Sequence, residues 1–137
     1  MNAQVRIPNQ AALARYASVK VTTASPGQIL VMLYDGLLRF LREAKTAIAE
    51  KNQARAGERI GRALKILEHL LGSLDPQHAP KLCEMLQGLY MFCMRHLVRA
   101  NIEKSADKID DVIRMLSPLR DAWSTAVAQV AATGEGR

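Results

Sequence analysis

The stretch of sequence that decides the fold covers residues 25–50 and reads SPGQILVMLYDGLLRFLREAKTAIAE. Its first residues predict a helix start, because the Ser25 side chain can accept a hydrogen bond from the backbone amide of Gln28, and Pro26 suits the first helical position. Apolar residues then recur at the three-and-four spacing of one helix face, at Ile29, Leu33, Leu37, Phe40, Leu41, Ala44, Ala47 and Ile48. We therefore expect an amphipathic helix over residues 26–50, about 37 Å long.

Three further segments carry the same periodicity, and the expected helices cover residues 53–74, 80–104 and 106–130. Asn52 can cap the start of the first of these helices and Ser105 the start of the last. No stretch of the sequence shows the period-two alternation of a β-strand. Four helices of similar length with short connectors predict an all-α chain folded as an antiparallel up-down four-helix bundle.

Both ends of the chain are expected to lie outside the bundle, which takes up residues 25–130. Residues 1–24 form a polar, basic and flexible N-terminal arm, which we expect to be partly disordered or to cap an apolar groove of the bundle. Residues 131–137 should fray. Pro118 falls inside the last expected helix, where it removes a backbone amide, so we expect the helix to kink there or to end a turn early.

The composition suits a single compact domain, since 49% of the 137 residues are apolar and 23% are charged. The longest apolar runs, 29–34 and 89–94, are far shorter than the roughly 18 residues of a membrane span, and no apolar secretory segment precedes them. Cys83 and Cys93 lie on one expected helix, about 15 Å apart and too far for a disulfide. We therefore expect a cytoplasmic protein with free thiols and no stable membrane insertion.

Residue patterns that support catalysis or metal binding are missing from the sequence. A di-metal site in a bundle needs Glu-x-x-His pairs, and no histidine here has a glutamate three residues before it. Cys93 and His96 have a suitable spacing, but no second pair accompanies them on a neighbouring helix. There is also no Gly-rich phosphate loop and no Ser/His/Asp arrangement. We expect a protein that is not an enzyme and holds no metal or cofactor.

The net charge is +6, and much of it comes from residues 39–65, which contain eight basic and three acidic residues. A basic surface can bind nucleic acid or an acidic partner. These charges alternate with the apolar period, however, which is typical of a solvated helix face. The alternative function is therefore a basic helical-bundle adaptor that binds nucleic acid or another acidic partner. In the main interpretation we expect no nucleic acid as partner.

Two runs carry more apolar surface than a small bundle can bury. Residues 29–34 and 89–94 are apolar around the whole helix circumference, although a bundle helix needs an apolar stripe of about three positions in seven. Either the N-terminal arm covers the excess or it forms an exposed groove for a partner, and Met32, Met91 and Met94 suit an adaptable binding surface. Core packing is the other interpretation of the same residues.

Several blocks of residues also resemble a known family. The opening blocks are Tyr16, Thr23-Ala24-Ser25-Pro26 and Met32-Leu33-Tyr34-Asp35-Gly36, with Arg39-Phe40 close behind. The later blocks are Glu68 with Ser73-Leu74-Asp75, then Leu89-Tyr90, Leu97 with Ala100-Asn101, and Leu119-Arg120-Asp121-Ala122-Trp123. In this order, over residues 16–123, they resemble the FliS family of flagellar secretion chaperones. The connector from Pro76 to Pro80 and the internal Pro118 depart from the family pattern.

The resemblance implies a cytosolic bacterial export chaperone with an antiparallel four-helix bundle. It would bind the C-terminal region of newly made flagellin, prevent premature polymerisation and help to deliver flagellin to the flagellar type III export gate. The client would wrap around the bundle in a largely extended path with helical pieces. We expect a monomer or a weak homodimer.

The expected client groove is formed or supported by two helices, with Ile29, Met32, Leu33, Tyr34 and Asp35 on the first and Leu89, Tyr90, Cys93, Met94, Leu97 and Asn101 on the third. Asp35 and Asn101 could fix the client backbone, with a solvent-facing Asp and a helix-end Asn as the alternatives. Phe40 and Trp123 are predicted to be core residues. In the arm, Tyr16 and Val19 are expected to lie on the empty groove and, once displaced by flagellin, to contact the export gate.

Overall fold

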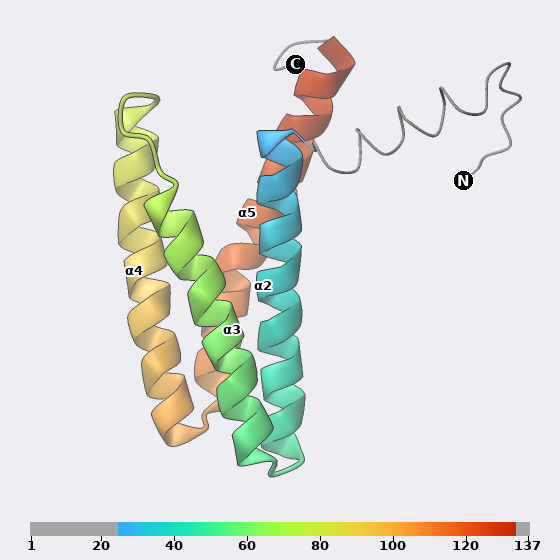
Figure 1. Cartoon of the computed structure of the whole chain (residues 1–137), viewed down its shortest axis with the longest axis vertical. Helices are drawn as coiled ribbons and strands as arrows, with labels where there is room; N and C mark the ends of the chain where they lie inside the picture. Colours follow the sequence, from blue (N-terminus) through green and yellow to red (C-terminus); the bar gives the residue numbers. More distant parts are fainter. Residues whose placement is uncertain (1–24, 134–137) are drawn as a thin grey trace, which may run out of the picture.

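The computed structural model describes residues 25–133, and these residues form an all-α bundle (Figure 1). Its helices are α2 (Pro26–Ala49), α3 (Gln53–Gly72), α4 (Pro80–Glu103) and α5 (Ala106–Thr133). Each helix packs against the helices before and after it in the chain, and α5 closes the ring against α2. The predicted antiparallel up-down four-helix bundle is therefore confirmed.

Side-chain caps start three of the helices, at the residues that the sequence indicated. Ser25 Oγ accepts a hydrogen bond from the amide of Gln28 at 3.1 Å, and the Gln28 side chain accepts from the amide of Ser25 at 3.0 Å. Asn52 Oδ1 accepts from the amide of Arg55 at 3.1 Å, and Ser105 Oγ accepts from the amide of Lys108 at 3.2 Å. These bonds satisfy amides that the first turn of a helix leaves without intrahelical partners.

Asp75 organises the connector between α3 and α4. Its carboxylate accepts a hydrogen bond from the amide of Gln77 at 3.1 Å and lies 2.8 Å from Nδ1 of His78. The bond with the His78 side chain, followed by that from the Gln77 amide, lowers the pKa of Asp75. Ala79 adopts a left-handed φ of 54°, after which Pro80 begins α4 without a side-chain cap. The connector is therefore a defined turn.

Helix α5 differs from the expectation at two places. A kink or an early end was expected at Pro118, and of these two the early end is wrong, because the helix continues through the proline. Residues 131–133 continue the helix where fraying was expected. Pro118 and Arg114 are both exposed, so the carbonyl that loses its partner at the proline can bind water. Residues 1–24 and 134–137, including the predicted arm, lie outside the described residues.

A hydrogen bond between two tyrosines joins opposite corners of the ring inside the core. The hydroxyls of Tyr34 on α2 and Tyr90 on α4 lie 2.6 Å apart, and both side chains are buried. Burial raises the pKa of both tyrosines and raises the pKa of the buried Cys93 thiol to about 11, so all three groups are neutral near pH 7.

Cys83 and Cys93 are both free thiols, as predicted. None of the described helices is long and apolar enough to cross a membrane.

Candidate protein-binding surfaces

The predicted groove residues divide into buried and exposed groups. Those in the core are Tyr34, Tyr90, Cys93 and Leu97, with exposed fractions of 0–1%. A bound protein cannot touch these four side chains in this conformation, so they can support a groove from beneath but cannot line it. Leu33, Leu89 and Met94 are half-buried against the core, whereas Ile29 and Met32 are 45% and 65% exposed.

One edge of α4 presents an apolar row toward α5. This α4–α5 edge consists of Leu82, Met85, Leu89 and Phe92, whose spacing places them on one side of the helix. The first two are 41% and 55% exposed, Leu89 is half-buried and Phe92 is 41% exposed. Four residues further along the same side, His96 stacks on Phe92 with ring centroids 5.2 Å apart, and its Nε2 lies 2.8 Å from Oδ2 of Asp111 on α5.

The opposite edge of α4 presents a second apolar row, toward α3. This α4–α3 edge consists of Met91, Val98 and Ile102, with exposed fractions of 41%, 46% and 78%. Asn101 marks the side of α4 that faces α3, because its side-chain oxygen lies close to Gly57 of α3. Among these exposed residues of α4, the sequence pointed to Leu89 as a groove residue and to Met91 as suited to a binding surface. The others were not predicted, because helical spacing alone does not say which side of an apolar run faces the core.

The two polar residues of the predicted groove are engaged within the bundle. Arg120 on α5 donates from Nε to Oδ1 of Asp35 at 2.7 Å and from Nη2 to Oδ2 at 3.3 Å. This pair ties α2 to α5 and raises the pKa of Arg120. Asn101 Oδ1 accepts from Nζ of Lys104 at 2.5 Å, near the end of α4. Asp35 therefore acts here as a link between helices, a role that sequence spacing could not reveal across 85 positions.

The two aromatic residues predicted as core are half-buried. Phe40 packs against the core from α2, and the Arg39, Arg59 and Arg62 guanidiniums lie 4.8, 5.1 and 5.9 Å from its ring centroid. Trp123 also packs against the core. Its buried Nε1 makes no hydrogen bond within the described residues.

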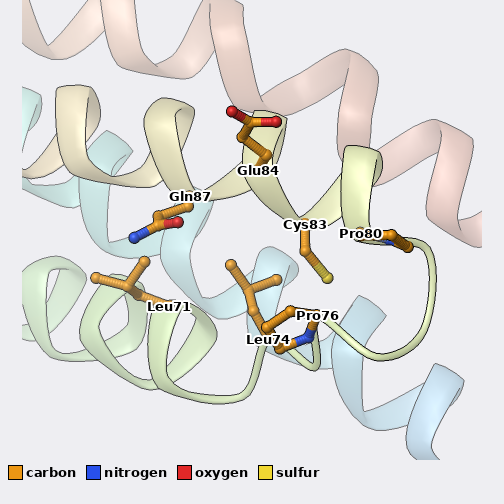
Figure 2. Close-up of a pocket in the computed structure, with 7 residues that line it drawn as sticks. All are labelled: Leu71, Leu74, Pro76, Pro80, Cys83, Glu84 and Gln87. Atoms are coloured by element: carbon orange, nitrogen blue, oxygen red, sulfur yellow. The ribbon is translucent and has the colours of Figure 1, made fainter.

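A small hollow lies where α3 ends and α4 begins (Figure 2). It has a volume of about 280 Å³ and is lined by Leu71, Leu74, Pro76, Pro80, Cys83, Glu84 and Gln87. The Cys83 thiol points toward Leu74 and Pro76 and donates to the carbonyl oxygen of Asp75 at 3.2 Å. The hollow is large enough for one apolar side chain of a bound segment.

The spacing of Cys93 and His96 does not produce a metal site in the described residues. Cys93 is fully buried in the core, whereas His96 points to Asp111 on α5. More generally, residues 25–133 contain no group of three or more His, Cys, Asp and Glu side chains that could hold a metal ion.

With the fold and its exposed apolar edges described, the chain can be compared with known proteins. The sequence profile of the family described as "Flagellar protein FliS" matches residues 9–130. The flagellar secretion chaperone FliS of Bacillus subtilis (strain 168) is 32% identical over 112 residues, which are 82% of this chain and 83% of the relative. The FliS of Escherichia coli (strain K12) is 31% identical over 108 residues, 78% of this chain and 79% of the relative.

The fold comparison agrees with the sequence comparison. A crystal structure of a flagellar chaperone from bacteria superposes with a TM-score of 0.72 at 20% identity, covering 89% of this chain and 99% of that chain. The molecule is therefore a helical-bundle chaperone of bacterial flagellum assembly. The chain belongs to the FliS family of flagellar secretion chaperones, a chaperone family and not an enzyme family.

Proposed function

We propose that this protein binds the C-terminal region of flagellin in the bacterial cytoplasm, keeps it from polymerising and helps to deliver it to the flagellar type III export gate. The observation that carries the proposal is the apolar surface of α4, which remains exposed on both edges although the helix is anchored in the core. Exposed apolar rows on a small bundle mark protein-binding sites more often than they mark solvent-facing surface.

The α4–α5 edge suits an apolar segment of the client. Its residues repeat at the spacing of successive helical turns, so an amphipathic helix laid along α4 can place its own apolar residues between them. Met85 can adapt its shape to such residues. On the other side of α4, the hollow between α3 and α4 beside Cys83 can take a further apolar side chain. The α4–α3 edge extends the same surface around α4, which suits a client that wraps around the bundle.

The core beneath α4 supports this surface. Leu86, Tyr90 and Leu97 are buried on the inner side of α4, and the Tyr34–Tyr90 hydrogen bond fixes the helix against α2. A fixed surface lowers the ordering cost on the chaperone side. Most of the entropic cost then falls on the client, which must order as it binds, so we expect an interface of about 2,000 Å² or more and a negative heat-capacity change.

Calorimetric titration of the full chain with a synthetic flagellin C-terminal peptide tests the proposal. The double variant Met85→Ser/Phe92→Ser should bind about thirtyfold more weakly, because two apolar contacts are lost. The matched variant Met85→Leu/Phe92→Leu keeps the edge apolar and should bind within about threefold of the wild type. Wild-type affinity and heat-capacity change in the serine variant would exclude the α4–α5 edge, and an absence of wild-type binding would exclude this client.

A further inference from the structure

A cluster of arginines covers the outer surface of α2 and the neighbouring edge of α3. This arginine surface consists of Arg39, Arg42, Arg55, Arg59 and Arg62, interspersed with Glu43 and Glu58. It lies away from α4, because α2 occupies the corner of the ring opposite α4 and packs along α3 and α5. The apolar edges of α4 and the arginine surface are therefore separate parts of the molecule.

A shallow hollow in the arginine surface has two arginines with unused hydrogen-bond donors. It is lined by Arg39, Arg42, Glu43, Thr46 and Arg55 and has a volume of about 260 Å³. Glu43 accepts a hydrogen bond from Nη1 of Arg59 at 2.8 Å and lies 3.9 Å from Nε of Arg39. Arg42 and Arg55 are exposed, and neither is in an ion pair among the described residues that line this hollow, although Arg55 helps to lower the pKa of Glu43. Both guanidiniums can therefore bind an incoming group.

The surroundings of the hollow are held in place. Arg59 lies between two carboxylates, donating to Glu58 Oε1 at 2.5 Å as well as to Glu43, and only 19% of its side chain is exposed. Its guanidinium and those of Arg39 and Arg62 also cover the Phe40 ring. Hydrogen bonds from Arg59 are the main reason why the pKa values of Glu43 and Glu58 are lowered, so both remain ionised. The arginines around Phe40 are therefore already ordered, and the side-chain entropy lost on binding comes mainly from Arg42 and Arg55.

We propose that the arginine surface docks an acidic protein segment, whose Asp or Glu carboxylates are bound by Arg42 and Arg55. The planar guanidinium matches a carboxylate with two parallel hydrogen bonds. Glu43 and Glu58 argue against nucleic acid, because a continuous row of phosphates would pass over them. A membrane surface is also disfavoured, because the aromatic ring at the centre, Phe40, lies beneath guanidiniums and cannot insert into lipid.

The test measures binding of a fluorescent Glu-rich peptide to the full chain by anisotropy at low salt. The variant Arg42→Gln/Arg55→Gln should bind about tenfold more weakly, because two charge-assisted contacts are lost. The control Arg95→Gln/Arg99→Gln removes the same charge from exposed arginines of α4 and should change binding less than about twofold. Thermal melting followed by circular dichroism confirms that both variants fold.

Three outcomes would overturn the proposal. The first is an absence of peptide binding by the wild type, and the second is an equal loss in both variants, which would show that only overall charge matters. The third is tighter binding of a poly-dT oligonucleotide or of phosphatidylglycerol vesicles that depends on Arg42 and Arg55. That result would assign the surface to nucleic acid or to lipid.

Discussion

At the scale of single residues, the hydroxyls of Tyr34 and Tyr90 are the most consequential polar atoms of the core. They satisfy each other at 2.6 Å across the core, between helices at opposite corners of the ring. The sequence could show that both tyrosines lie in apolar runs, and the resemblance to the FliS family drew attention to both. It could not show that they meet, because the rotation of each helix is set by the helices on either side of it.

Removing both of these hydroxyls should cost less than the two single losses added together. Tyr34→Phe leaves the Tyr90 hydroxyl buried without its partner, and we expect a loss of about 1–3 kcal/mol in the free energy of unfolding. The double variant Tyr34→Phe/Tyr90→Phe should be less destabilised than the sum of the two single variants. Urea unfolding of all four proteins measures the coupling energy. Strict additivity would show that the hydroxyls contribute independently.

Cys93 should make stability sensitive to alkaline pH. Burial raises the pKa of this thiol from 9.0 to about 11, so the unfolded chain releases the proton at lower pH than the folded chain. The corresponding stability is complete below about pH 9 and is lost as the pH rises through about 11. Urea unfolding across this range should show a shallower decline for Cys93→Ala than for the wild type. Parallel declines would mean that the thiol titrates alike in both states.

At the scale of the helices, the starts were predictable and the outward faces were not. The helix starts could be predicted because each N-cap bonds to an amide only three residues further along the chain. The caps are Ser25, Asn52 and Ser105. The apolar run 89–94 is different, because the structure places Tyr90 and Cys93 in the core and the exposed residues between and beside them on opposite edges of α4. Which residues of this run are buried and which are exposed depends on how α4 packs against α3 and α5. A local sequence pattern does not show that packing.

Gly27 allows a close approach between the beginning of α2 and the end of α5 (Figure 1). A Cβ atom at this position would lie 2.8 Å from Cγ2 of Val127, so Gly27→Ala should lower the free energy of unfolding by about 1–3 kcal/mol. Gly61 in α3 is the matched control, because a Cβ there meets no atom within 4 Å. Gly61→Ala should stabilise the protein by about 0.5–1 kcal/mol. Equal effects in urea unfolding would contradict the close contact.

At the scale of the whole molecule, two surfaces of different chemistry lie at opposite corners of one bundle. Composition predicted both an apolar and a basic excess, but it could not say that they would be separated. The separation implies different responses to salt. Binding of the proposed flagellin segment should change little between about 50 and 300 mM salt, whereas binding of an acidic peptide should weaken steeply. A steep salt dependence for the flagellin peptide would contradict an apolar interface.

The two roles expected of the N-terminal arm, covering the client surface and contacting the export gate, remain predictions. Tyr16 and Val19 lie outside the described residues. If the arm lies on the client surface and later contacts the export gate, a chain that lacks residues 1–24 should bind the flagellin peptide more tightly. It should also support less flagellin secretion in cells. Unchanged affinity together with unchanged secretion would exclude both roles of the arm.

The arrangement of α4 has a consequence for local motion. A helix that leaves apolar surface on both flanks forgoes part of the burial that would anchor it, and α4 packs less extensively against its neighbours than α2 does. Backbone amides of α4 should therefore exchange with deuterium sooner than those of α2, through openings well short of global unfolding. The inner side of α4 stays anchored in the core through these openings, and a bound client should slow the exchange of its amides by covering the exposed flanks.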